Sequence, residues 1–221
     1  MQPPAQNPDI IVVGSGAAAL SAALTAAQGG ATVVVLEKSD KVGGTTAMSG
    51  AGIWAPANHI ARAAGFEDSE AETLEYLRAT APPGWAETED SLWASYAEAA
   101  PKALELIDQH TPIKFEITPE PDPMAEYPGG KREGRMLSPK AIRRGVAGKF
   151  GPKIRRSTLP HLFTYVEGHE IRPYAHPIRA VLQLLPKLIV RLLTNARGQG
   201  NALVAGLISG CLDHGVEIKT S

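Results

Sequence analysis

The chain opens with Asp9-Ile-Ile-Val-Val-Gly-Ser-Gly-Ala-Ala-Ala19, and Val33-Val-Val-Leu-Glu37 follows after a helix-like run. In order, these residues predict a strand, a glycine turn, a helix, a second strand and an acid. The small-residue positions of a dinucleotide-binding fingerprint are filled by Gly14, Gly16 and Ala19. Glu37 lies 21 residues after Gly16, the spacing expected of an acid that binds a ribose. The opening therefore predicts a dinucleotide site and, with it, redox chemistry.

Each part of this opening has a physical role. Ile10 to Val13 is rich in β-branched residues, which is typical of a parallel strand buried on both faces. Gly14 allows a tight turn, and Gly16, which has no β-carbon, lets the backbone approach a pyrophosphate closely. Ala19 replaces the usual third glycine, where the helix lies close to the sheet. A helix that begins near Ser15 would point its N-terminal amides at the phosphates.

The helix body and the second strand complete the unit. Ala17 to Gln28 is rich in Ala and Leu, which favour helix, and Gly29-Gly30 ends it. Val33 to Leu36 forms the second strand, so that Glu37 at its tip can accept hydrogen bonds from ribose hydroxyls. The alternative is an ordinary strand-turn-helix unit that binds nothing. The flanking strands, the spacing to Glu37 and the residues that follow argue against that alternative.

A second loop follows the acid. Gly43-Gly44-Thr45-Thr46 concentrates backbone amides and hydroxyls, which are the donors that a second phosphate-sugar segment needs. Ser49-Gly50-Ala51-Gly52 continues with small residues, so a flat ring system could approach the backbone. A nicotinamide enzyme would not need this loop directly after the acid. The two loops together favour a flavin over a nicotinamide.

The same residues carry a family resemblance. Glu37-Lys38, Gly43 to Thr46 and Ser49 to Trp54 resemble the flavoproteins of the fumarate reductase/succinate dehydrogenase superfamily. The stretch from Thr45 to Asn58 is most similar to the 3-ketosteroid Δ1-dehydrogenases and their relatives. The resemblance is dense over residues 9 to 58 and thinner afterwards. It implies FAD as the cofactor and an α/β fold of Rossmann type, with a parallel sheet and helical additions.

The resemblance also implies a position along FAD for individual residues. Those implied near the pyrophosphate are Gly14, Ser15, Ala17 and Ala18. Glu37 would bind the adenosine ribose. The residues implied along the ribityl and flavin side, beside the Gly43-Gly44 turn, are Lys38, Thr45, Thr46, Ser49 and Gly50. The alternative for Thr45 and Thr46 is a capped turn, because threonine often caps a helix.

Length and composition limit the classes of protein to which this chain can belong. The 221 residues are 43% hydrophobic with a net charge of −1, which is enough for one sizeable domain with a core. A single cysteine, Cys211, excludes an internal disulfide and suits a reducing cytoplasm. Met1 to Pro8 is polar and proline-rich, unlike a signal peptide. Because no run of about 20 apolar residues occurs, no membrane-spanning helix is expected.

The charge is unevenly distributed. Residues 131 to 156 contain ten lysines and arginines against one acid, Glu133. Such a segment could meet nucleic acid or anionic lipid. It has one aromatic residue, Phe150, and no nucleic-acid motif, so no nucleic-acid partner is expected. The favoured interpretation is a solvated loop that faces the acidic remainder of the chain.

The middle of the chain predicts helices and then an irregular stretch. Ser69 and Glu72 form a capping-box pattern that opens a helix. Pro101, within the helical pattern of 90–108, predicts a kink or two shorter helices. A strand is expected at 113–117. The expected segments are a fingerprint and flavin loop (1–58), a helical part (59–118), an irregular basic part (119–175) and helices with a returning strand (176–221).

The last of these segments contains an apolar helical stripe from Val181 to Leu192. Pro186 interrupts it, which favours two short helices. The stripe either faces the core or rests on a membrane surface through residues 180–193, with Lys187 and Arg191 off the stripe. A helix from Gly200 and a strand from Val216 follow. In the resembled family these return to the FAD domain before the substrate domain, which implies that the present chain is the N-terminal portion without that domain.

Catalytic candidates are few. Dehydrogenation beside a ketone needs an acid and a base, while the flavin carries the hydride. In the resembled steroid dehydrogenases tyrosines do this work, and one precedes a Pro-Gly-Gly stretch. Tyr127 directly precedes Pro128-Gly-Gly130, whereas the family pattern lies earlier, at Pro123 and Met124. Tyr127 is the catalytic candidate. The alternative is that Tyr127 is a loop tyrosine whose ring only packs against its neighbours.

No metal site is expected. The histidines that could suggest one are His161, His169 and His176. Their spacings of eight and seven residues fit no compact zinc pattern, and no acid or cysteine completes a set.

Three functions stay open. The first is dehydrogenation or reduction of a carbon–carbon bond next to a carbonyl, with a small apolar ketone or unsaturated carbonyl such as a ketosteroid as substrate. The second is a fumarate-reductase-like enzyme that acts on a small carboxylate. The third is a flavin-binding module without catalysis. Arg and His in the substrate domain would favour the second, and tyrosines there would favour the first.

Overall fold

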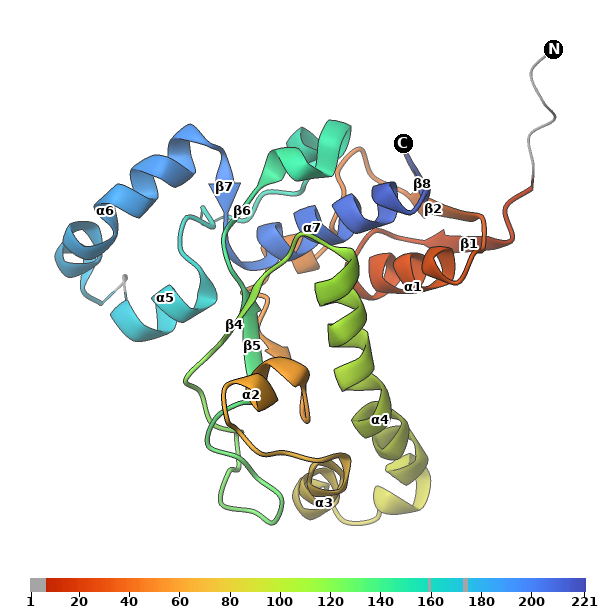
Figure 1. Cartoon of the computed structure of the whole chain (residues 1–221), viewed down its shortest axis with the longest axis vertical. Coiled ribbons are helices and arrows are strands. Elements are labelled where there is room, and N and C mark those ends of the chain that lie inside the picture. The colour runs from red at the N-terminus through yellow and green to blue at the C-terminus, as the bar shows by residue number, and fades with distance from the viewer. Residues whose placement is uncertain (1–6, 159, 173–174) are drawn as a thin grey trace.

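The computed structural model describes residues 7–158, 160–172 and 175–221. Its elements gather around the long buried helix α7, with a parallel sheet at one end, α5 and α6 at the other, and α3 and α4 below (Figure 1). The helices, with η for 3-10 helices, are α1 (Ala17–Gln28), η1 (Thr46–Met48), α2 (His59–Ala63), α3 (Glu70–Thr80), α4 (Ala86–His110), η2 (Arg144–Lys153), α5 (Tyr165–Ile171), α6 (Pro177–Leu193) and α7 (Gln199–Asp213). The strands are β1 (Ile10–Val13), β2 (Val33–Glu37), β3 (Ile53–Trp54), β4 (Phe115–Ile117), β5 (Met136–Pro139), β6 (Ile142–Arg143), β7 (Ala196–Arg197) and β8 (Glu217–Thr220).

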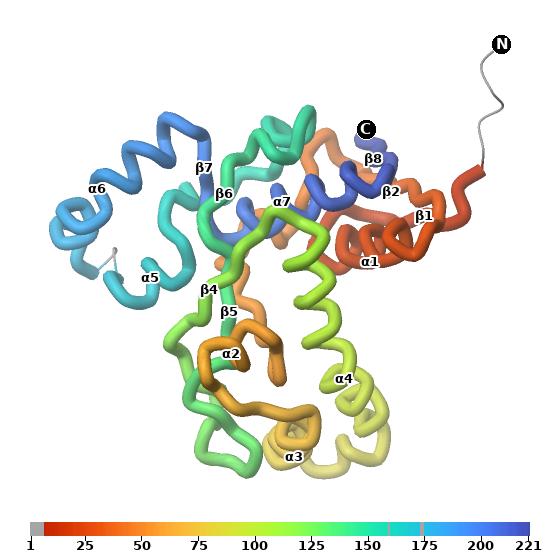
Figure 2. The backbone as a smooth tube through the Cα atoms, in the orientation of Figure 1, coloured from red at the N-terminus to blue at the C-terminus, as the bar shows by residue number. Residues whose placement is uncertain are grey.

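The expected strand-turn-helix-strand unit is confirmed. Strands β1, β2 and β8 form a parallel sheet in the order β1-β2-β8. Val35 pairs with Val12 on one side and with Ile218 on the other. The chain leaves this sheet after β2 and returns to it only with β8, as the tube in Figure 2 shows. The fold is therefore α/β, and its first and last strands are held apart by β2.

The expectation that β1 is buried on both faces is wrong. Ile11 is 59% exposed and Val13 is 82% exposed. Ile11 and Val13 are alternate residues and so share one face of β1, an edge strand of the sheet, and little of the described chain covers them there. In β2, by contrast, Val33 and Val35 are buried because they face the core that α1 and α7 fill.

The segment expected to be irregular is more regular than its composition suggests. It contains β5, β6, η2 and α5, and β5 lies between β3 and β4 in an antiparallel sheet. Sheet pairing partners far away in the sequence produce this order, so no local pattern signals it. The segment is also not simply solvated, because Arg135 is 2% exposed.

The expectation that Pro186 divides its segment into two short helices is wrong, and so is the alternative of two shorter helices at Pro101. Pro101 lies inside α4 and Pro186 lies inside α6, and both helices continue past the proline. A proline removes one backbone hydrogen bond and crowds the preceding turn. In α4 the helix is held on both sides of Pro101, because Ala97 and Leu104 are both buried. Tertiary packing therefore outweighs the local cost.

The core is centred on α7. Every residue from Gly200 to Cys211 is buried, and the helix packs against α1, η1 and η2. The Cys211 thiol contacts the carbonyl oxygen of Leu20 at 3.3 Å, and burial raises its pKa to about 12. Cys211 is therefore a packing residue and not a reactive thiol.

Helix α6 departs most from a core-facing helix. Ala180 and Leu184 are buried, but Ile178, Leu182 and Leu193 are more than 70% exposed. Arg191 anchors the helix through an ion pair with Glu167 of α5 at 2.6 Å. None of the helices in the described part of the chain is both long and apolar enough to cross a membrane.

Candidate nucleotide site

A cavity of about 910 Å³ opens at the carboxyl ends of β1 and β2, and some of the predicted cofactor residues line it. The cavity lies at the N-terminal end of α1, which is where a parallel sheet of this type binds its ligand. The predicted residues that line it are Gly14, Ser15, Gly16, Glu37, Lys38, Gly44 and Thr45. The predicted residues outside its lining are Ala17, Ala18, Gly43, Thr46, Ser49 and Gly50.

Gly14 makes the turn between β1 and α1 possible. Its φ is +93°, a backbone conformation that side-chain-bearing residues rarely adopt. Its N–H donates to the carbonyl oxygen of Leu36 at 2.7 Å, which extends the pairing of β1 with β2 to the cavity edge. No other atom lies within 4 Å of where a β-carbon at Gly14 would stand. The backbone is therefore open to close approach by a ligand.

Glu37 and Ser15 form a linked pair at the base of the cavity. The Glu37 carboxylate accepts from the Ser15 N–H at 3.1 Å, from the Ser15 hydroxyl, and from the Ser39 N–H at 3.0 Å. Ser15 is buried, and its oxygen accepts from the Gly43 N–H at 2.8 Å. A carboxylate has about four acceptor positions, so Glu37 keeps capacity toward the cavity. Ser15 thus joins the acid to the second loop.

Thr46 caps α1 from outside the helix. Gly16, at the N-cap position, has no side chain to bond the first-turn amides. The Thr46 hydroxyl oxygen accepts from the Ala17 N–H at 3.0 Å instead. The capping role considered for threonine is therefore present, but the capped helix is α1 and not the threonine's own η1. This bond fixes the second loop to the helix whose dipole points at the cavity.

Tyr165 covers the small-residue stretch after Thr46. A β-carbon at Gly50 would come within 2.8 Å of the Tyr165 ring, and Gly52 faces the same ring. The Tyr165 hydroxyl donates to Glu120 at 3.1 Å. Burial, and then the Glu120 carboxylate, raise the pKa of this tyrosine. The glycines do allow a flat ring to approach, and in this structure that ring belongs to the protein.

Arg155 lines the cavity from a segment far along the chain. A parallel bridge joins Val42 to Ile154, with Arg155 N–H donating to the Val42 carbonyl oxygen at 2.9 Å. Together with Lys38 and Lys41 it gives the cavity three cations. The lining residues not singled out from the sequence are Val13, Leu36, Ser39, Lys41 and Arg155. For Arg155, only its place in a basic segment could have been a signal.

The N-terminus of α7 supports the second loop from behind. Gly200 N–H donates to the Ser49 carbonyl oxygen at 2.9 Å, and the Asn201 amide donates to the Ala47 carbonyl oxygen at 2.7 Å. A β-carbon at Gly200 would overlap the carbonyl oxygen of Thr46 and would stand 2.8 Å from that of Ser49. The loop therefore lies directly on the backbone of α7.

Tyr127 is not among the residues that line the nucleotide cavity. It is 44% exposed, and its N–H donates to the Met124 carbonyl oxygen within a turn. Among the described residues, no three His, Cys, Asp or Glu side chains gather as a metal site would require. Of the histidines, His161 is buried beside Asn201, and burial lowers its pKa.

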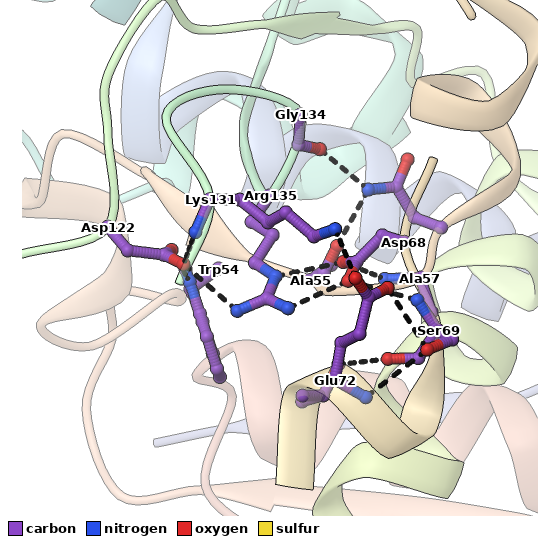
Figure 3. A network of polar contacts seen from close by, with 12 residues as sticks. Trp54, Ala55, Ala57, Asp68, Ser69, Glu72, Asp122, Lys131, Gly134 and Arg135 are labelled. Carbon is purple, nitrogen blue, oxygen red and sulfur yellow. Dashed lines mark hydrogen bonds and ion pairs between the residues drawn. The ribbon is translucent and has the colours of Figure 1, made fainter. Parts of the chain in front are cut away.

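A buried ion network holds the segment that follows β3 (Figure 3). Arg135 donates to both oxygens of Asp68 at 2.7 and 2.8 Å and to Asp122 at 2.9 Å. Burial raises the pKa of Asp68, but the bonds from Arg135 and the Ala57 N–H outweigh it, and the net pKa is lowered. The Trp54 indole donates to Asp122 at 2.6 Å. The network joins β3, β5 and the loops around them.

The parallel sheet, the glycine turn at the N-terminus of α1 and the acid at the tip of β2 define a dinucleotide-binding module. The second loop, fixed to α1 through Thr46, continues the cavity beyond what one turn would form. The chain belongs to the FAD binding domain family, whose model matches residues 9–221. Its cofactor is accordingly FAD.

Dehydrogenases are among the relatives of this chain. It is 36% identical to a 3-oxosteroid 1-dehydrogenase of Mycolicibacterium smegmatis, over 96% of this chain and 39% of the relative. It is 32% identical to a 4-oxocyclohex-2-ene-1-carboxylate 5-dehydrogenase of Sinomonas cyclohexanicum, over 96% of this chain and 38% of the relative.

A solved structure supports the same family. The 3-ketosteroid Δ1-dehydrogenase of Sterolibacterium denitrificans, in complex with 1,4-androstadiene-3,17-dione, superimposes with a TM-score of 0.81 and 31% identity. The alignment covers 96% of this chain and 40% of that one. The chain thus spans about two fifths of the length of the relatives that it matches.

Proposed function

We propose that this chain is the FAD-binding part of an enzyme that dehydrogenates or reduces a carbon–carbon bond next to a carbonyl. The observation that carries the proposal is the cavity where the glycine turn, Glu37 and the second loop meet. FAD supplies the hydride chemistry when bound. The substrate class is a small cyclic ketone, because the relatives named above act on a ring that carries an oxo group. A 3-ketosteroid is the first candidate.

The residues of this chain fit FAD by charge and by shape. Lys38, Lys41 and Arg155 can neutralise the pyrophosphate, and the open backbone at Gly14 lets it approach. Glu37 would accept from the ribose hydroxyls. The exposed apolar side chains of Val13 and Leu36 supply a wall against which an adenine ring could lie.

Two other functions remain to be distinguished by experiment. A small-carboxylate reductase would turn over fumarate-like acids, whereas the proposed enzyme would reduce an artificial electron acceptor in the presence of a cyclic ketone. A flavin-binding module without catalysis would do neither. We expect weak FAD retention and no turnover by these 221 residues alone. Robust ketosteroid desaturation by them would contradict that expectation.

Replacing Glu37 by Gln is expected to weaken FAD binding by about tenfold, because a charge-assisted bond to the ribose becomes a neutral one. The measurement is a titration of FAD fluorescence with protein. Since Glu37 also accepts from Ser15, riboflavin and adenosine should be titrated separately. A ribose role predicts that adenosine loses more affinity than riboflavin.

The control for this substitution is Glu217→Gln. Glu217 lies on the neighbouring strand β8 and contacts only Lys219 among charged groups in the described chain. It should leave FAD affinity unchanged. Equal FAD affinity in Glu37→Gln and the unaltered chain would argue against the ribose role.

We further propose that α6 rests on a membrane surface, where apolar ketones concentrate. The exposed apolar side chains that support this are Ile178, Val181, Leu182, Leu185, Ile189, Val190, Leu192 and Leu193. Ile178→Glu combined with Leu182→Glu is expected to lower sedimentation with anionic lipid vesicles about tenfold, because apolar area leaves the interface. Leu92→Glu, on the exposed face of α4, is the control for added charge. Equal sedimentation of all three proteins would contradict the proposal.

A further inference from the structure

A second cavity, of about 390 Å³, is lined by three arginines: Arg144, Arg156 and Arg197. None of its lining residues belongs to the nucleotide cavity. The two cavities meet at consecutive residues, because Arg155 lines the nucleotide cavity and Arg156 lines the second one. Successive side chains of an extended segment point to opposite sides, which explains the separation.

The fold brings these arginines together from three places. Strand β6 pairs with β7 so that Ile142 lies opposite Arg197, and Arg144 follows β6 directly. The Arg144 N–H donates to the Asn195 carbonyl oxygen at 3.2 Å. Arg156 follows the bridge between Ile154 and Val42. The arrangement is therefore built by regular pairing and not by a chance meeting of surface side chains.

The cluster lacks negative charge. The cavity lining contains no Asp or Glu, and none of the three arginines forms an ion pair with a described carboxylate. Burial lowers the pKa of Arg144, and the charges of Arg197 and Arg156 lower it further. Burial and then Arg156 lower the pKa of Arg197 in the same way. The three guanidinium groups therefore repel one another.

Arg144 is the least satisfied member. It is 5% exposed, and the one hydrogen bond that its side chain makes in the described chain is to the Ile154 carbonyl oxygen at 2.8 Å. Its Nε is buried without a partner. A buried guanidinium without a counter-charge is costly, and a buried polar atom normally has a partner. An anion in the cavity would supply the counter-charge for the guanidinium and a hydrogen-bond acceptor for its Nε.

We propose that this cavity binds a phosphate-type oxyanion, distinct from the pyrophosphate of FAD. A phosphate group matches the planar donors of arginine and can accept from several of them at once. Asn201, in the first turn of α7, also lines the cavity, so the positive end of that helix faces the ligand. The cavity is less than half the volume of the nucleotide cavity, which suits one or two phosphate groups and excludes a whole dinucleotide.

The test measures the midpoint of thermal unfolding with inorganic pyrophosphate at constant ionic strength. Pyrophosphate should raise the midpoint of the unaltered chain, since a ligand stabilises the state that binds it. Arg156→Gln combined with Arg197→Gln should abolish most of this rise and weaken pyrophosphate binding by about tenfold or more. Arg156→Gln alone should weaken pyrophosphate binding partially. Because Arg156 is exposed, this single variant should fold normally even if the double variant does not.

The matched control is Arg155→Gln combined with Lys41→Gln, which removes the same charge from the nucleotide cavity. It should keep the part of the rise that depends on Arg156 and Arg197, and lose only the part that pyrophosphate binding at the nucleotide cavity contributes. Loss of the rise in this control, with retention in the Arg156 and Arg197 variants, would overturn the proposal and place the anion at the FAD site. No rise in the unaltered chain would overturn it as well. FAD affinity is measured separately, so a negative result for the second cavity does not contradict the proposed function.

Discussion

Gly200→Ala is expected to lower the free energy of unfolding by about 3 kcal/mol, at the upper end of what overpacking costs. The added β-carbon would overlap the backbone oxygen of Thr46 and approach that of Ser49. Neither atom can move alone, because Thr46 caps α1 and Ser49 accepts from Gly200 itself. The second loop must therefore shift away from α7. We expect FAD affinity to fall together with stability, which urea unfolding and FAD titration would measure.

The control for this substitution is Gly168→Ala. Gly168 lies inside α5, and no atom outside its own helix turn lies within 4 Å of an added β-carbon. Alanine favours helix over glycine by about 0.5–1 kcal/mol, so this variant should be slightly more stable than the unaltered chain. If Gly200→Ala is as stable as Gly168→Ala, the close contact between α7 and the loop is not present in solution.

Arg135→Met is expected to cost about 3–5 kcal/mol, the range for removing one partner from a buried ion network. The substitution keeps much of the side-chain volume beside the rings of Trp54 and Tyr76, whose centroids lie 5.7 and 5.5 Å from the guanidinium carbon. It leaves Asp68 and Asp122 buried without their cation. Urea unfolding, followed by circular dichroism, measures the loss.

A surface pair offers the matched comparison. Arg78 and Asp90 form the same two-point contact at 2.6 and 2.7 Å, but both side chains are more than one third exposed. Arg78→Met should therefore cost much less stability than Arg135→Met, because water and salt screen an exposed pair. Equal losses in the two variants would show that burial does not set the strength of the Arg135 network.

The secondary structure of the opening could be predicted from the sequence because its signals are local. The glycine positions, the β-branched runs and the spacing to Glu37 depend on neighbours within one strand-helix-strand unit, and β1, α1 and β2 form where that pattern predicts. The helix from Gly200 could be predicted for the same reason. The exposure of the β1 side chains could not be predicted, because it depends on which elements cover the sheet and not on the composition of the strand.

Positions that depend on distant partners were decided only by the tertiary structure. Local sequence cannot show that Thr46 caps α1, that Arg155 reaches the nucleotide cavity, or that Tyr165 lies over Gly50. It predicted two short helices around Pro186 and a kink or two shorter helices at Pro101, whereas both helices continue past their proline. By itself the sequence determined the dinucleotide-binding unit and the order of its strands and helix, because those rest on short-range geometry. The FAD family followed from the resemblance that its motifs carry. The tertiary structure decided which charges are paired, which cavities they line and which apolar faces stay exposed, because these depend on contacts between segments far apart in the chain.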